Sequence, residues 1–87
     1  MITFSEYLNL DEDIQTQVLS IDGVDLELKR NNGTLDVELY ALYNFYVEIF
    51  FDKATEEPLY LKPFRSLKKL EPYLKLVEIA EMPGLRH

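Results

Sequence analysis

The stretch ALYNFYVEIFFD, residues 41–52, decides how this chain folds, because it places apolar side chains on both faces of a predicted strand. Successive side chains of a β-strand point to opposite faces of the sheet. One row of this strand is apolar throughout: Phe45, Val47, Ile49 and Phe51. The other row contains a single charge: Tyr46, Glu48 and Phe50. The pattern predicts one buried face and leaves open what covers the other.

A β-hairpin is predicted just before this stretch. Residues 24–30 and 34–41 both alternate apolar and polar side chains, and Asn32-Gly33 lies between them. An Asn-Gly pair favours a two-residue loop, because both loop positions need a positive φ. Closing the hairpin there puts the apolar residues on one face and opposite charges together on the other. The predicted pairs are Leu28–Val37, Leu26–Leu39, Val24–Ala41 and Lys29–Asp36.

The length of the loop to the next strand is predicted from the requirement that apolar residues on the two strands share one face of the sheet. A three-residue loop, Leu42 to Asn44, lets Asn44 adopt the left-handed conformation that such loops require. It places Leu39 opposite Val47, so that both lie on the apolar face. A two-residue loop would instead place Leu39 opposite Glu48, and for that reason the three-residue loop is favoured.

A fourth strand is predicted in residues 59–65, LYLKPFR. Pro63 has no amide hydrogen, which indicates that this strand lies at a sheet edge or ends there. The favoured register brings together the pairs Ile49–Leu61, Glu48–Lys62 and Phe50–Tyr60.

Residues 1–22 are predicted to be helical. Thr3 and Glu6 have the spacing of a capping box. The acidic run 11–13 suits the first turn of a second helix, where the helix dipole favours negative charge, and Gly23 is a plausible end. The apolar stripe of this second helix is predicted to be Leu10, Ile14, Val18 and Ile21. Residues 14–21 also alternate well enough for a strand, and the sequence leaves helix and strand both open.

Residues 66–80 are predicted to form a short C-terminal helix and tail. Ser66 is a good N-cap, and apolar residues follow at helical spacing: Leu67, Leu70, Leu74 and Val77. Because proline is excluded from helix interiors, the pattern predicts a turn that ends at Leu70 and a second turn that begins near Pro72. Residues 76–80, LVEIA, are a candidate for a short return strand.

Together these elements predict one α+β domain over residues 1–87, since a chain of this length buries a single core. A four-stranded antiparallel β-meander covers residues 24–65, and the helical segments 1–22 and 66–80 pack on one face. That face is predicted to carry Leu26, Leu28, Val37, Leu39, Val47, Ile49, Phe51 and Leu61. This order of elements, with FYVEIFF and FRSLKKLEPYL, resembles a group of small uncharacterised bacterial proteins. The resemblance implies the fold and no activity.

The composition argues against several classes of function. The sequence has no cysteine and its one histidine is His87, so we expect no disulfide, no zinc site, no nucleophile–base pair and no cofactor. The net charge is −7, and residues 1–52 alone carry −9, which disfavours binding to nucleic acid or to a membrane surface. No apolar run reaches the ~20 residues of a membrane span. The first residues lack the order of a signal peptide, so the expected location is the cytoplasm.

The second face of the predicted sheet supplies the candidate site. The registers gather there an aromatic patch crossed by charges: Tyr40, Tyr46, Glu48, Phe50, Tyr60, Lys62 and Phe64. Exposed tyrosines are common on strands, but Phe50 and Phe64 have no polar group, and a patch of this size approaches that of contact surfaces. The same registers set Glu38 directly opposite Glu48. Two carboxylates are what a glycosidase or a hard-metal site needs, although screening by Lys62 and water is the simpler interpretation.

Three functions follow from these observations. The favoured one is a non-catalytic interaction module that binds a protein partner, or a second copy of itself as a homodimer, through the aromatic face or a sheet edge. The alternative is an acidic inhibitor or nucleic-acid mimic that binds a basic protein surface. The third is an enzyme that uses Glu38 and Glu48. The basic cluster is interpreted as a solvated rim: Lys62, Arg65, Lys68 and Lys69.

Overall fold

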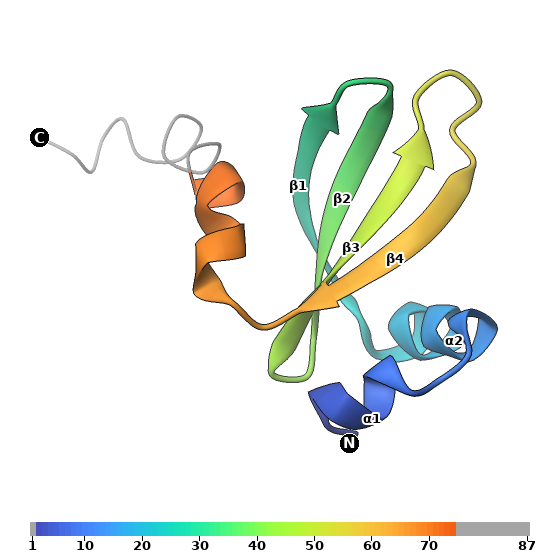
Figure 1. The fold of residues 1–87 in the computed structure, drawn as a ribbon, viewed down its shortest axis with the longest axis vertical. Coiled ribbons are helices and arrows are strands. Elements are labelled where there is room, and N and C mark those ends of the chain that lie inside the picture. The colour runs from blue at the N-terminus through green and yellow to red at the C-terminus, as the bar shows by residue number, and fades with distance from the viewer. Residues whose placement is uncertain (1, 75–87) are drawn as a thin grey trace, which may run out of the picture.

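The computed structural model describes residues 2–74 and shows an α+β fold (Figure 1). Four strands form one antiparallel sheet in the order β1-β2-β3-β4: β1 (Val24–Asn32), β2 (Leu35–Leu42), β3 (Phe45–Asp52) and β4 (Pro58–Phe64). The helices α1 (Phe4–Leu8) and α2 (Glu12–Asp22) precede the sheet. After it come the 3₁₀ helix η1 (Leu67–Leu70) and a helical turn at residues 71–74, which confirms the predicted break near Pro72. The candidate return strand, residues 76–80, lies outside the described residues, as does Val77.

The helix α1 begins with the predicted capping box. The backbone N–H of Glu6 donates to Thr3 Oγ1 at 3.1 Å, and the backbone N–H of Thr3 donates to Glu6 Oε1 at 2.8 Å. A helix of five residues is too short to be stable alone, so it depends on its packing. Tyr7 provides that packing, because its side chain is completely buried.

Residues 12–22 form a helix, which settles the choice between helix and strand. Of the predicted stripe, Leu10 and Val18 pack against the core, but the most buried positions of α2 differ from the prediction. Gln15 and Leu19 are buried, whereas Ile14 and Ile21 are 41% and 80% exposed. Two reciprocal hydrogen bonds set this rotation: the Tyr7 hydroxyl donates to the Gln15 carbonyl at 2.8 Å, and Gln15 Nε2 donates to the Tyr7 carbonyl at 2.8 Å. Buried polar groups must form hydrogen bonds. The hydrogen bonds between Tyr7 and Gln15 therefore stabilise this rotation of the helix more than the exposure of Ile14 destabilises it.

The first hairpin forms, but its loop lies one residue later than predicted. Asn32 pairs with Leu35, so the loop is Gly33–Thr34, and Gly33 provides the positive φ, +69°. A glycine at the first loop position suits the second common type of two-residue hairpin loop. Consequently the predicted partners of β1 are displaced by two residues on β2, and the observed pairs include Leu28–Leu39 and Lys29–Glu38.

A bulge in β1 absorbs this displacement. Leu26 and Glu27 have no partner in the register between β1 and β2, and Glu27 has a φ of +58°. The N–H of Glu27 donates to Asp25 Oδ1 at 2.8 Å, which holds the bulge in place. Beyond it Val24 pairs with Ala41, as predicted.

The second hairpin has a two-residue loop, Tyr43–Asn44, and the predicted three-residue loop is wrong. Tyr43, rather than Asn44, adopts the positive φ, +56°. The contacts of its side chain offset this unfavourable backbone conformation, because the hydroxyl donates to the Asp22 carboxylate and the ring packs edge-on against Phe45. Leu39 therefore lies opposite Glu48.

This change of register divides the predicted apolar face between the two sides of the sheet. Leu28, Val37 and Leu39 share a side with Glu48 and Phe50, and Leu26 packs in the same cluster as Leu28 and Leu39. The remaining members of the predicted face point to the other side: Val47, Ile49, Phe51 and Leu61. The predicted pair of Glu38 and Glu48 is also wrong: Glu38 lies opposite Ile49 on that other side and forms an ion pair with Lys29 at 3.7 Å.

The register between β3 and β4 agrees with the prediction. The pairs are Ile49–Leu61, Glu48–Lys62 and Phe50–Tyr60. Pro58 and Pro63 both lie in β4, which is an edge strand, where a missing amide hydrogen is tolerated.

The terminal segments cover opposite sides of the sheet rather than the single predicted face. The helices α1 and α2 pack on one side, around Tyr7, Leu19, Leu42, Phe45 and Val47. The segment of residues 66–74, called here the C-terminal segment, packs on the other side, where Tyr73 contacts Leu39 and Phe64. Both rows of β3 are thus covered by the chain itself. Among residues 2–74, no helix has the length and hydropathy needed to cross a bilayer.

Replacing Tyr7 with Phe tests the link between α1 and α2. The variant removes the hydrogen bond from the buried Tyr7 hydroxyl to the Gln15 carbonyl and should lower the free energy of unfolding by about 1 kcal/mol at pH 7. Burial raises the pKa of Tyr7 to about 12, above its ordinary value of 10. The wild-type protein should therefore lose stability as the pH rises from 10 to 12, because the unfolded chain releases this proton first. Urea unfolding across that range should show a smaller alkaline loss for Y7F, and equal losses would contradict the burial of the hydroxyl.

Candidate functional site

A buried carboxylate, that of Glu48, lies on the side of the sheet that the C-terminal segment covers. Glu48 is 6% exposed. Arg30 Nη2 donates to Glu48 Oε2 at 3.0 Å, and the Tyr73 hydroxyl donates to the same oxygen at 2.6 Å. Arg30 Nε in turn donates to the Tyr73 hydroxyl at 3.1 Å. These three side chains form a closed triangle, the Arg30–Glu48–Tyr73 network, which satisfies the buried charge.

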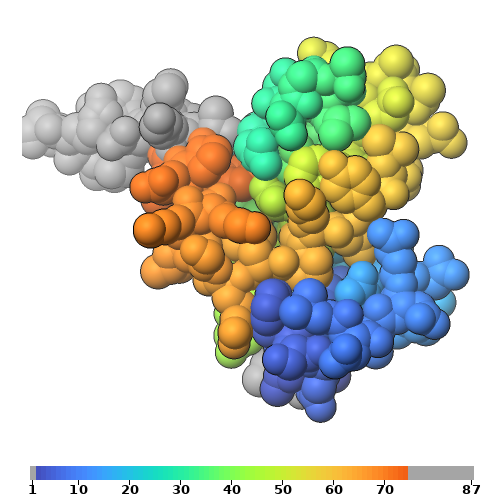
Figure 2. All heavy atoms as spheres, in the orientation of Figure 1, coloured from blue at the N-terminus to red at the C-terminus, as the bar shows by residue number. Residues whose placement is uncertain are grey.

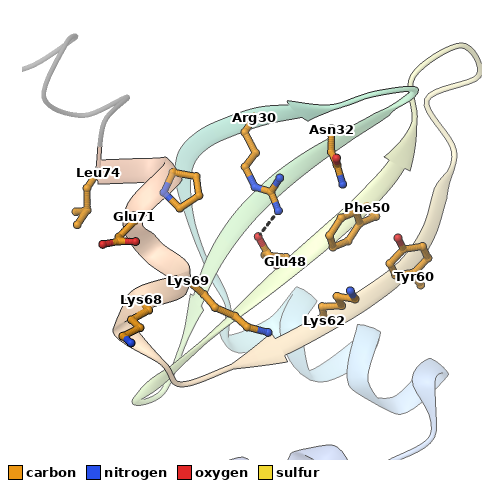
Figure 3. A pocket seen from close by; sticks show the side chains of 11 residues that line it. Arg30, Asn32, Glu48, Phe50, Tyr60, Lys62, Lys68, Lys69, Glu71 and Leu74 are labelled. Carbon is orange, nitrogen blue, oxygen red and sulfur yellow. Dashed lines mark hydrogen bonds and ion pairs between the residues drawn. The ribbon is translucent and has the colours of Figure 1, made fainter.

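The register explains how Arg30 reaches Glu48. The strands β1 and β3 are not neighbours, because β2 lies between them. Arg30 lies opposite Val37, and the short side chain of Val37 is fully buried beneath it. The guanidinium extends across β2 to the carboxylate on β3, as Figure 3 shows. A larger residue at position 37 would obstruct that path.

The surroundings of Arg30 keep its guanidinium charged, and those of Tyr73 keep its hydroxyl protonated. Burial opposes the charge of Arg30, but hydrogen bonds to Glu48 and Tyr73 outweigh it, and the pKa of the guanidinium is raised. The pKa of the Tyr73 hydroxyl is strongly raised, first by burial and then by its hydrogen bond to Glu48. Tyr73 therefore remains a proton donor to the carboxylate at any physiological pH.

A groove of about 1030 Å³ opens beside the network, between the sheet and the C-terminal segment. Figure 2 shows that segment, in orange, beside the green and yellow strands, with the blue N-terminal helices below them. Four of the lining residues are basic and two are acidic, in a chain whose net charge is −7. The groove is lined by Arg30, Asn32, Glu48, Phe50, Tyr60, Lys62, Lys68, Lys69, Glu71, Pro72 and Leu74.

Two stacked rings form the aromatic part of the groove. Phe50 and Tyr60 are cross-strand neighbours with centroids 4.7 Å apart and an interplanar angle of 20°. Phe50 is 3% exposed, whereas Tyr60 is 38% exposed. Lys62 Nζ lies 5.6 Å from the centroid of the Phe50 ring, within the range of a cation–π contact. Tyr60 is therefore the ring that remains accessible to a ligand.

The basic side chains differ in their direction. In Figure 3, Lys69 extends from η1 across the groove toward Lys62 on β4, and the Asn32 amide points into the groove from β1. Lys68 and Glu71 also line the groove, but their charged ends point away from β4 (Figure 3). Arg30, Lys62 and Lys69 are thus the cations that converge on the groove.

The structure places six of the seven predicted site residues on this side of the sheet. Glu48, Phe50, Tyr60 and Lys62 line the groove. Tyr46 and Phe64 stack on each other, with centroids 5.6 Å apart, and pack in the cluster of Tyr73. Tyr40 lies on the opposite side, among the residues that pack against the N-terminal helices.

The predicted exposure of the phenylalanines is wrong, because the C-terminal segment packs on this side of the sheet. Phe50 is 3% exposed and Phe64 is 4% exposed. Of the predicted patch, Tyr60 and Lys62 remain exposed.

Arg30, Asn32 and Tyr73 were not predicted as site residues, and Lys69 was predicted only as part of a solvated rim. Arg30 and Glu48 each carried a signal, since each is a charge in an otherwise apolar or aromatic row of its strand. Two opposite charges that each interrupt an apolar row predict a buried ion pair. Tyr73 gave no comparable signal, because leucines dominate its segment. Three residues of the basic cluster line the groove, whereas Arg65 lies over the Phe4 ring at 4.7 Å from its centroid.

The Glu48 carboxylate is held by hydrogen bonds at one of its two oxygens. Both bonds go to Oε2, one from Arg30 and one from the Tyr73 hydroxyl. Within residues 2–74 no three His, Cys, Asp or Glu side chains gather as metal ligands. Comparisons of the chain with protein-family models, with curated proteins and with solved structures find no match. Its function is therefore inferred from the groove alone.

A double-mutant cycle on Arg30→Met and Glu48→Leu should reveal strong coupling. Each single change leaves one buried charge without its partner and should lower the free energy of unfolding by about 3 kcal/mol. The double variant should recover at least about 1.5 kcal/mol of the summed loss, as measured by urea unfolding.

The Lys29–Glu38 pair provides the matched control. Its atoms are 3.7 Å apart and its side chains are 59% and 28% exposed, so the same cycle there should give a coupling below about 1 kcal/mol. Equal coupling for the two pairs would contradict the assignment of Arg30–Glu48 as the buried anchor.

Proposed function

We propose that this protein is a non-catalytic interaction module that binds a protein partner, or a second copy of itself, in the groove beside the Arg30–Glu48–Tyr73 network. The observation that carries the proposal is the groove, in which the exposed Tyr60 ring and the cations of Lys62 and Lys69 lie beside the buried Glu48. The cysteine-free sequence supports a cytoplasmic setting for this interaction.

The floor of the groove is already rigid before a ligand arrives. Glu48, Phe50 and Val37 are buried in the central strands, and the network holds Arg30 in one orientation. A ligand that enters such a site does not have to order these side chains, which lowers the entropic cost of binding. The volume is similar to that of ligand pockets in other proteins, about 300–1,000 Å³.

Features of the sheet edges favour the groove over strand addition. The edge strand β4 contains Pro58 and Pro63, which cannot donate backbone hydrogen bonds. The other edge strand, β1, is interrupted by its bulge at Leu26 and Glu27. Prolines and bulges are the means by which edge strands avoid pairing with other chains. Binding through a sheet edge is therefore the less favoured of the two hypotheses.

Photocrosslinking in cells tests the proposal directly. A benzophenone amino acid replaces Lys62 in the groove or, as a control, Lys53 on the exposed loop between β3 and β4. We expect discrete adducts from position 62 and none from position 53. Mass spectrometry then distinguishes a second copy of the chain from another protein.

Binding of the purified partner provides the quantitative test. Exposed tyrosines at the centre of an interface often contribute most of the affinity, so Tyr60→Ala should weaken binding roughly tenfold or more. The neighbouring residue Leu59 is also exposed, at 46%, but is not part of the groove lining, and Leu59→Ala should have little effect. Equal effects of the two substitutions, or adducts from neither crosslinker position, would contradict the proposal.

A further inference from the structure

We infer that the ligand of the groove is an acidic, extended segment of a partner protein. This inference rests on the proposed function and adds the chemistry of the partner. It starts from the cations that line the groove, because their charge is not neutralised by the part of the chain that the structure describes. Lys62 and Lys69 form no ion pair within residues 2–74, and both are exposed.

Both lysines contribute positive charge to the same groove. Lys69 extends from the C-terminal segment toward β4, whereas the Lys62 ammonium turns toward the Phe50 ring, 5.6 Å from its centroid (Figure 3). Cations that line one groove repel each other, and a bound anion reduces that repulsion. A carboxylate in the groove would be attracted to both lysines.

Arg30 adds a third donor at the floor of the groove. The network uses its Nε and Nη2 atoms, which leaves the N–H groups of Nη1 for a ligand. The Asn32 amide points into the same space, where it can bond to a peptide carbonyl or amide (Figure 3). The groove thus offers charged donors together with a group suited to a peptide backbone.

The charge of the whole chain determines which anion fits. At physiological salt a charge acts over about 8 Å, so a short segment in the groove interacts mainly with Arg30, Lys62 and Lys69. A long polyanion such as a nucleic acid would extend beyond the groove along a protein with a net charge of −7. This difference favours a few carboxylates over a phosphate backbone.

The exposed ring favours a peptide over a small anion. Tyr60 stacks on Phe50 and is the accessible part of the aromatic pair. Successive side chains of an extended peptide point in opposite directions, so carboxylates can meet the lysines while an apolar side chain packs on Tyr60. A free carboxylate or phosphate would not use that ring.

Fluorescence anisotropy with three matched peptides tests the inference on the full chain. The probe is a fluorescein-labelled hexapeptide of glutamates with one central tyrosine, and the controls carry glutamine or lysine in place of glutamate. The glutamate peptide should bind roughly tenfold tighter than the glutamine peptide, and its affinity should fall as salt increases. The lysine peptide should not bind.

Substitutions then locate the binding. Replacing Lys62 and Lys69 with Gln should weaken binding of the glutamate peptide roughly fivefold. The matched control replaces Lys29 and Lys53, two lysines that do not line the groove, and should change the affinity less than about twofold. Both double variants remove the same total charge, so a difference between them is a property of the groove.

Several outcomes would overturn the inference. Equal binding of the glutamate and glutamine peptides would do so, as would equal losses from the two double variants. A single-stranded oligonucleotide of matched charge that binds more tightly would make the ligand a nucleic acid instead. If the groove crosslinks a partner but does not bind the glutamate peptide, the inference alone is wrong, whereas failure of the crosslinking itself refutes the proposed function.

Discussion

The buried carboxylate of Glu48 is the constraint on which the rest of this structure depends. A charge that is 6% exposed must be paired and hydrogen-bonded, because an unpaired buried charge costs several kcal/mol. Its two partners come from distant parts of the chain, Arg30 in β1 and Tyr73 in the C-terminal segment. The hydrogen bonds to Glu48 therefore connect β1, β3 and the C-terminal segment. They also determine that the C-terminal segment packs on the side of the sheet that carries Glu48.

The architecture follows from that pairing. Because Glu48 lies on the side of Leu39, the alternate residues Phe45 and Val47 point to the opposite side, where the N-terminal helices cover them. Tyr73 bonds to Glu48 and packs on Leu39 and Phe64, which anchors the C-terminal segment beside the sheet. The groove is the space between this anchored segment and the sheet, and it is lined from β1, β3 and β4. The same ion pair thus stabilises the fold and shapes the surface proposed to bind a partner.

Local patterns were predictable from the sequence, and long-range compensation was not. The capping box of Thr3 and Glu6 and the register of β3 with β4 depend on neighbouring or facing residues, and both predictions are confirmed. The β2–β3 register failed because a carboxylate was assumed to avoid the apolar face, and its partners lie 18 and 25 residues away. For the candidate site, Glu48 and Lys62 were predicted correctly. Tyr73 was not predicted, because the leucines near it, Leu67 and Leu74, were expected to be the buried residues, whereas both are exposed.

Proton–proton distances from NMR test the position of Glu48 most directly. The ring of Tyr73 packs with Leu39 on one side of the sheet, whereas Val47 lies on the other side with the N-terminal helices. We expect nuclear Overhauser effects from the Tyr73 ring to the Leu39 methyl groups and the Glu48 side chain, and none to the Val47 methyl groups. Effects from the Tyr73 ring to Val47, with none to Glu48, would show that the carboxylate does not organise this fold.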